Sequence, residues 1–375
     1  MSNLHIIKAK WLSTNVDQDV RNIGLDIIRA ACAIFVVLAH TNNILGKYLP
    51  VYKVLFPIGS LAQEVFFSLS GFLIGSQLLK FANKDFQIKQ LFGFYLKRWI
   101  RTVPFYFLFI GINYFIYIFW YKNSGLNLFS ADFNVGGYFS FSQNLFDRHP
   151  VFYPEIWPIP IEEWSYLLIP LPLIMVCFIS KNSPFKYFIA VLILLICVIN
   201  AWRINYVLAY NPEQDWELRK IVAYRMDALL YGVLVSVIVK TNEDFFRKYK
   251  TRLLIVGLVV SVTTSFAGLI LKSQYINVIL FTILPLSSAL ILPYFRFTIF
   301  KNNALSRIMT HTSLVSYAIV LSHLYFLQFL FINMFRPTDL WSAIATTVGY
   351  LIVLIIFSTF FYNFVERPVL LLRKN

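Results

Sequence analysis

Runs of about 20 apolar residues, bounded by charged residues, proline or asparagine, recur along the whole chain. A run of this length crosses the hydrocarbon core of a bilayer as one α-helix. Ten such runs are centred near residues 35, 71, 111, 171, 197, 231, 262, 285, 325 and 353. Because lipid offers no partner to unpaired backbone groups, spans of this kind must be helical. The pattern therefore predicts an all-α integral membrane protein with about ten transmembrane helices.

The first run carries two ionisable residues, one at each end of "RAACAIFVVLAH". A helix turns about 100° and rises about 1.5 Å per residue, so Arg29 and His40 lie on one face, about 16 Å apart. Arg29 either snorkels toward the headgroups or pairs with Asp26 one turn earlier, and His40 is either a buried, hydrogen-bonded imidazole or a functional group. The functional hypothesis is that both residues line one path through the membrane.

The distribution of charge predicts the sidedness of the chain. An even number of spans places both termini on one side, and 22 of the 33 Lys and Arg residues lie on that side, as expected for the cytoplasm. We predict a single transmembrane domain over residues 1–375, with a cytoplasmic N-terminal segment at 1–24 and a long extracytoplasmic loop at 122–163. No cleavage site precedes the first run, so residues 25–45 are expected to stay as a signal anchor.

Composition narrows the class of protein further. Hydrophobic residues make up 58% of the chain and charged residues 14%, against about 25% charged in soluble domains. This excludes a soluble protein and makes membrane lipid a direct partner. The net charge of +15 does not indicate nucleic acid, because the basic residues are scattered between hydrophobic segments. The three cysteines lack paired spacings, so neither a disulfide framework nor a metal site is expected.

Ionisable side chains inside membrane spans usually face a cavity or a partner, because they are costly to insert. Arg225 and Asp227 lie two positions apart and point in different directions, which predicts separate partners on other spans. Glu163 and His149 are expected to be solvated loop residues. Most aromatic side chains of the long loop are expected at the membrane interface. They are Phe139, Phe141, Phe152, Tyr153, Trp157 and Trp164.

Several short segments share a family's motifs and its motif order. The first span has a basic residue, ten intervening residues and a histidine. The later segments are "EVFFSLSGFLI" (64–74), "FYLKRWIRTVPFY" (94–106), "WPIPIEEWSYLLIP" (157–170), "YRMDALLYG" (224–232), "SYAIVLSHLYF" (316–326) and "FVERPVLLL" (364–372). Together they resemble the acyltransferase-3 family of membrane acyltransferases over nearly the whole chain. Glu64 stands where the family more often has Asp, and Pro158 where it more often has Ser.

The resemblance implies transfer of an acyl group, most often acetyl from acetyl-CoA, to a hydroxyl of a glycan. The acceptor is expected to be a bacterial cell-surface glycan, such as O-antigen lipopolysaccharide or capsule, or a lipid-linked glycan. The enzyme is expected in the inner membrane as a multi-pass protein. Some members carry a further hydrolase-like domain, whereas this chain ends at Asn375 and is expected to be the stand-alone form. Two alternatives stay open, transfer of another acyl group such as succinyl and a glycan exporter without acyl chemistry.

Residues in these motifs have side chains suited to that reaction. His40 is expected to be the general base, because imidazole titrates near neutral pH, and the catalytic set also includes Arg29 and Glu162. Arg98 and Arg101 are spaced to hold CoA phosphates, with anchoring at the membrane surface as the alternative. Five residues are assigned to the acceptor sugar, with structural roles as the alternative for Asp227 and His323. They are Glu64, Trp157, Tyr166, Asp227 and His323.

Overall fold

The computed structural model describes residues 21–50, 52–82, 88–121, 135–179, 184–271 and 273–371. Within these ranges the secondary structure is helical and contains no strand. Ten segments are long and apolar enough to cross a membrane, and each contains one of the predicted centres. The prediction of an all-α membrane protein with about ten spans is therefore confirmed. Most of the predicted N-terminal segment at 1–24 lies outside the described residues.

Some spans are single helices and others are built from two consecutive helices. The long single helices are α2 (Ile23–His40), α4 (Tyr52–Ala82), α5 (Ile88–Ile116), α9 (Pro184–Tyr210), α10 (Asp227–Thr241), α11 (Glu243–Ile270), α12 (Gln274–Phe297) and α15 (Leu340–Phe361). Two further spans join α7 (Pro158–Leu168) to α8 (Pro170–Ile179), and α13 (Ala304–Ser322) to α14 (Phe329–Phe335) through the π-helix η7 (His323–Gln328). The short elements are α3 (Asn42–Leu45), η2 (Tyr117–Tyr121), α6 (Val135–Phe139), η4 (Pro154–Ile156), η5 (Gln214–Arg219), η6 (Val222–Tyr224), η8 (Tyr362–Glu366) and α16 (Arg367–Leu371).

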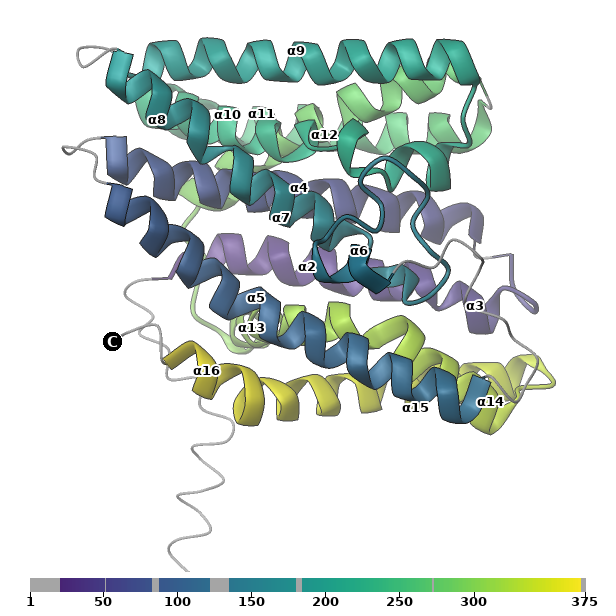
Figure 1. Ribbon diagram of the computed structural model, residues 1–375. Coiled ribbons are helices and arrows are strands. Elements are labelled where there is room, and N and C mark those ends of the chain that lie inside the picture. Colours follow the sequence, from purple (N-terminus) through teal and green to yellow (C-terminus); the bar gives the residue numbers. More distant parts are fainter. Residues whose placement is uncertain are drawn as a thin grey trace, which may run out of the picture.

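The helices lie side by side, with α9 at one edge of the bundle and α15 at the other (Figure 1). Helix α2 runs through the middle, where it packs against α4 and α13. It begins at the same end of the bundle at which α16 ends, as an even number of spans requires, while α3 and α14 lie at the opposite end. The side of the membrane that each end faces stays a prediction.

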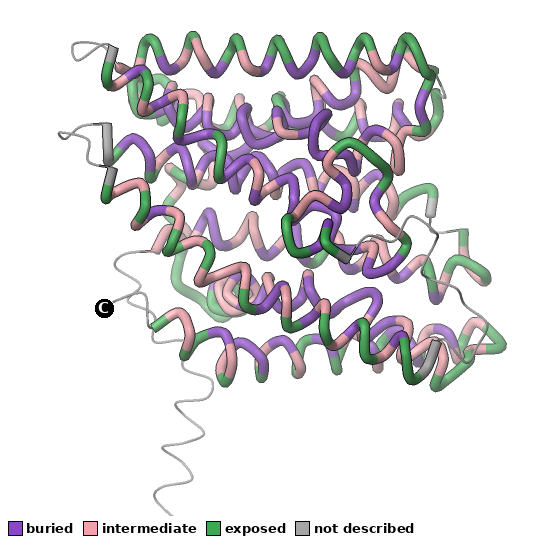
Figure 2. Tube along the Cα trace, in the orientation of Figure 1, coloured by how far each residue is buried: buried purple, intermediate pink, exposed green. Residues whose placement is uncertain are grey.

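The most buried spans are those of α4 and α10 (Figure 2). The two helices approach closely because glycine faces the partner backbone on both sides. A Cβ on Gly71 would overlap the carbonyl oxygen of Leu229, and a Cβ on Gly232 would overlap that of Ser68. Small residues at helix contacts are the usual route to tight packing in membranes, where the hydrophobic effect does not drive helices together.

Two fully buried ion pairs join α10 and the residues before it to neighbouring helices. Arg225 Nη2 donates to both carboxylate oxygens of Glu64, at 2.8 and 2.6 Å. Asp227 pairs with Arg203 at 2.9 Å. The prediction that Arg225 and Asp227 have separate partners on other spans is confirmed. Glu64 and Asp227 had been assigned to the acceptor sugar, but their carboxylates are engaged in these pairs, which favours structural roles.

The long loop predicted at 122–163 is shorter than expected. Residues 122–134 lie outside the described part, but η4 and α7 already occupy positions 154–163 and belong to the fourth span. The expectation that Glu163 and His149 are solvated is wrong, because their exposed fractions are 6% and 2%. Burial lowers the pKa of the His149 imidazole to about 3. Three aromatics expected at the interface, Phe152, Tyr153 and Trp157, are buried in the protein instead.

Candidate active site

Three cavities lie in a row beside α2, and each shares wall residues with the next. The Lys80 cavity, of about 580 Å³, is lined by Arg21, Arg29, Lys80, Lys240 and Arg296, among others. The Arg101 cavity, of about 130 Å³, shares Arg29, Leu73 and Gln77 with it. The His40 cavity, of about 310 Å³, shares Val36, Gln63, Pro158 and Val320 with the Arg101 cavity. The row therefore follows α2 from its first turns to its C-terminal residue.

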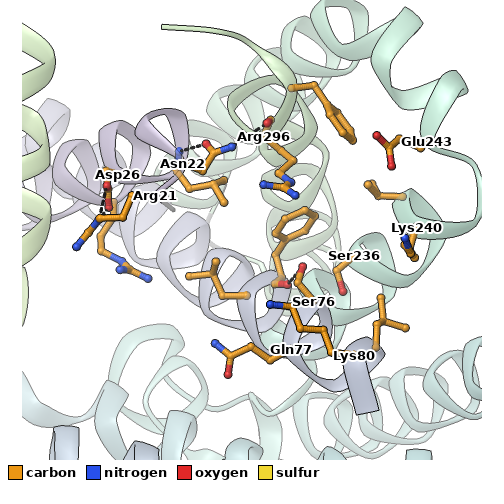
Figure 3. Close-up of a pocket in the computed structure, with 17 residues that line it drawn as sticks. Arg21, Asn22, Asp26, Ser76, Gln77, Lys80, Ser236, Lys240, Glu243 and Arg296 are labelled. Carbon is orange, nitrogen blue, oxygen red and sulfur yellow. Dashed lines mark hydrogen bonds and ion pairs between the residues drawn. The ribbon is translucent and has the colours of Figure 1, made fainter. Parts of the chain in front are cut away.

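The Lys80 cavity gathers positive charge at the end of the bundle where α2 begins (Figure 3). Its two carboxylates already have partners. Asp26 pairs with Arg21 at 2.6 Å, and Glu243 pairs with Arg247 at 2.5 Å. No described carboxylate forms an ion pair with the remaining cations of the wall, which are Arg29, Lys80, Lys240 and Arg296. Such a surface suits a ligand with several negative charges.

The Arg101 cavity brings together three predicted arginines. Arg29 reaches it from α2, and Arg98 and Arg101 reach it from one face of α5, as their spacing predicts. The guanidinium of Arg98 lies 4.0 Å from the centre of the Tyr166 ring, a cation–π contact that leaves its edge free for hydrogen bonding. The alternative that Arg29 pairs with Asp26 is wrong, because Asp26 is held by Arg21 and by the Ser313 hydroxyl.

Glu162 belongs to the Arg101 cavity and has no described contact with His40. Its two carboxylate oxygens accept hydrogen bonds from the hydroxyls of Ser70, at 2.9 Å, and Tyr166, at 2.8 Å. The described geometry therefore gives Glu162 no direct contact through which to orient the imidazole. It faces the three arginines instead, so the cavity carries an excess of positive charge.

Two histidines face each other in the third cavity. His323 Nε2 lies 3.3 Å from His40 Nδ1. His40 Nδ1 is also 2.9 Å from the Val36 carbonyl oxygen, and His323 Nδ1 is 2.9 Å from that of Val320. A carbonyl oxygen only accepts hydrogen bonds, so each Nδ1 must carry a proton. It follows that His323 Nε2 accepts from His40 Nδ1, and that His40 Nε2 keeps its lone pair.

The histidine pair is fixed by hydrogen bonds that involve η7, α3 and α15. Gln328 donates to the His40 carbonyl at 2.8 Å and accepts from Asn43 at 2.9 Å. The Tyr350 hydroxyl donates to the His323 carbonyl at 2.9 Å. His323 opens the π-helix η7, a widened turn of a kind often found at functional sites. The sequence assigned His323 to the sugar, whereas the structure places it against His40.

A short segment after α9 completes the wall of the His40 cavity, a role that no sequence pattern indicates. Asp215 bridges Arg219 at 2.8 Å and Lys220 at 2.7 Å. Burial opposes ionisation of Asp215, but these two cations outweigh it and lower the pKa of the carboxyl below its usual value. Arg219 also lies over the ring of Trp157, a predicted sugar contact that does line this cavity. Because the segment lies between spans, only three-dimensional packing shows where it faces.

Comparison with known proteins identifies the family. A family model described as "Acyltransferase domain", that of the acyltransferase-3 family, matches residues 22–363, nearly the whole chain. Searches of curated proteins and of solved structures give no significant match. With ten potential membrane spans in the described residues, the match also fits a protein of the membrane. The chain therefore belongs to the acyltransferase-3 family, and it is a membrane acyltransferase that transfers groups other than amino-acyl groups.

Proposed function

We propose that this acyltransferase moves acetyl from acetyl-CoA to a hydroxyl of a bacterial cell-surface glycan, in the inner membrane and with both termini in the cytoplasm. One observation carries the proposal. The row of cavities along α2 has a cluster of cations at one end and an imidazole with a free lone pair at the other. A polyphosphate donor from the cytoplasm and a sugar hydroxyl from outside would meet between these two ends.

The donor is an extended molecule with a charged nucleotide end and a long thioester arm. We assign its phosphates to the cations of the Lys80 cavity, with Arg98 and Arg101 further along the path, since guanidinium groups bind phosphate through two parallel hydrogen bonds. By sequence, Lys80, Lys240 and Arg296 belong only to the basic residues that indicate the cytoplasmic side. Their shared cavity is what adds them to the site.

We assign the role of general base to His40. Its Nε2 takes the proton of the sugar hydroxyl while the oxygen attacks the thioester carbonyl. The new C–O bond forms, the C–S bond breaks, and the thiolate of CoA leaves with the proton that His40 returns. The neutral His323 ring accepts from His40 Nδ1 throughout, so the imidazolium formed on the way keeps a hydrogen bond on that side.

The test exchanges the base for an amide. His40→Gln keeps hydrogen bonding but cannot take up a proton, so acetyl transfer from labelled acetyl-CoA to chemically de-acylated surface glycan should fall by at least about 10²-fold. His311→Gln is the matched control, because His311 contacts Thr359 and lines none of these cavities. Both variants should melt near the parent temperature in detergent. A His40→Gln protein that acetylates glycan at the parent rate rules out the assignment.

A second acyl group fits one feature of the path. The Arg101 cavity sets three guanidinium groups against the single carboxylate of Glu162, and a succinyl group would bring a second negative charge there. Competition between acetyl-CoA and succinyl-CoA for the purified full chain decides between them. Preference for succinyl-CoA that disappears in Arg101→Gln would replace acetyl as the donor group.

A further inference from the structure

Two residues that line the His40 cavity each hold a buried polar atom that the proposed reaction does not use. Among the described residues that line it, Glu155 Oε2 and Arg219 Nε are buried and have no hydrogen-bond partner. One is an acceptor and the other a donor. A buried polar atom without a partner destabilises the protein that holds it, so such atoms commonly mark places where a ligand supplies the missing bond.

Glu155 is held in place by the backbone around it. Its Oε1 accepts from the Tyr325 amide at 2.6 Å, inside the same π-helix that His323 opens. Tyr153, two residues before Glu155, has a φ of 52°, a left-handed conformation that is strained for a tyrosine. Its hydroxyl donates a hydrogen bond to the Leu321 carbonyl at 2.6 Å. The turn therefore fixes the carboxylate, and only 5% of Glu155 is exposed.

Arg219 is fixed just as firmly from the other side. Asp215 binds its Nη1 at 2.8 Å, and the guanidinium lies 5.1 Å from the centre of the Trp157 ring. Asn144 Nδ2 donates both to the Trp157 carbonyl at 3.0 Å and to the Lys220 carbonyl at 2.6 Å. This amide therefore clamps the segment that carries Arg219 to the segment that carries Glu155.

We infer that the His40 cavity is the acceptor site and that it binds one sugar ring through a pair of hydroxyls, an inference that rests on the proposed function. One hydroxyl donates to Glu155 Oε2, and the oxygen of another accepts from Arg219 Nε. The cavity volume of about 310 Å³ falls within the range of about 300 to 1,000 Å³ found for small-molecule sites. Trp157 and Trp216 also line the cavity and add apolar surface of the kind that packs against sugar rings.

The experiment measures acceptor and donor kinetics separately on the purified full chain in detergent. Glu155→Gln keeps an oxygen for the Tyr325 amide but removes the second oxygen acceptor, and Arg219→Lys keeps the charge but removes the Nε–H donor. Each should raise the KM for de-acylated glycan by about tenfold, as expected when one hydrogen bond at a buried site is lost. The KM for acetyl-CoA should stay at the parent value.

Two control variants separate this role from general effects of the substitution. Glu163→Gln alters another buried carboxylate, one that lines none of the three cavities. Arg148→Lys alters an exposed arginine that is paired with Glu217. Both should leave the KM for glycan unchanged. Parent values for Glu155→Gln and Arg219→Lys would overturn the inference and leave the cavity as a water-filled space.

Failure of the inference and failure of the proposed function give different results. Release of CoA thiol with water as acceptor reports the donor half of the reaction and needs no sugar. If the parent protein releases thiol but never labels glycan, the proposed acceptor class is wrong. If the parent labels glycan and the two variants do so with unchanged KM, only the acceptor site is misplaced.

Discussion

His323 Nε2 is a second acceptor for the His40 Nδ1 proton, because the Nδ1 proton of His323 is itself committed to the carbonyls of α13. We predict that His323→Leu, which leaves the Val36 carbonyl as the acceptor for His40 Nδ1, lowers glycan acetylation about tenfold or more, since the imidazolium formed in the reaction loses one of its hydrogen bonds. His323→Gln offers an amide oxygen in place of the ring nitrogen and should recover part of the rate. Turnover at saturating glycan and acetyl-CoA checks this, and equal rates for the Leu and Gln variants would contradict it.

Single residues differ in how far the sequence could place them. Arg29 and His40 share a face because helical periodicity alone sets their relation, and each lines a cavity of the row, Arg29 the first two and His40 the third. The contact of His40 with His323 joins residues 283 positions apart, so it depends on how α2 and α13 pack. Glu155 left only a weak signal, a lone carboxylate between two prolines in an apolar stretch, "YPEIWP".

Helix packing gives a prediction at the level of elements. Gly71→Ala would place a methyl group against the backbone of α10, so we expect the free energy of unfolding to fall by about 1–3 kcal/mol. Gly111→Ala in α5 is the control, because a Cβ there meets nothing within 4 Å and alanine favours a helix by up to about 1 kcal/mol. The melting temperatures of the two variants are compared in the same detergent. Equal values would show that α4 and α10 can move apart without loss of stability.

The spans themselves were predictable, because hydropathy over 20 residues is a property of sequence alone. The error lay at positions 154–163, where three glutamates and three prolines resemble a loop. Proline suits the first turn of a helix, as Pro158 does in α7, and all three glutamates turn into the protein. Burial of a carboxylate in this position depends on the neighbouring helices, which no local pattern records.

The row of cavities gives a prediction for the molecule as a whole. Val36 lines both the Arg101 and the His40 cavities, so Val36→Trp should block the path between them. Acetyl transfer to glycan should fall at least about tenfold, while acetyl-CoA should still bind to the Lys80 cavity. Val259→Trp, on the exposed face of α11, is the control and should change neither. Normal transfer by Val36→Trp would show that the reactants meet elsewhere.

The narrow Arg101 cavity also bears on the electrical insulation of the membrane. A continuous column of water along α2 would conduct protons and dissipate an ion gradient. The Arg101 cavity is the smallest of the three, at about 130 Å³. Arg29, Arg98 and Arg101 place positive charge there, which raises the barrier for a passing cation. The positive charge to which we assign donor binding therefore also hinders the passage of cations across the bilayer.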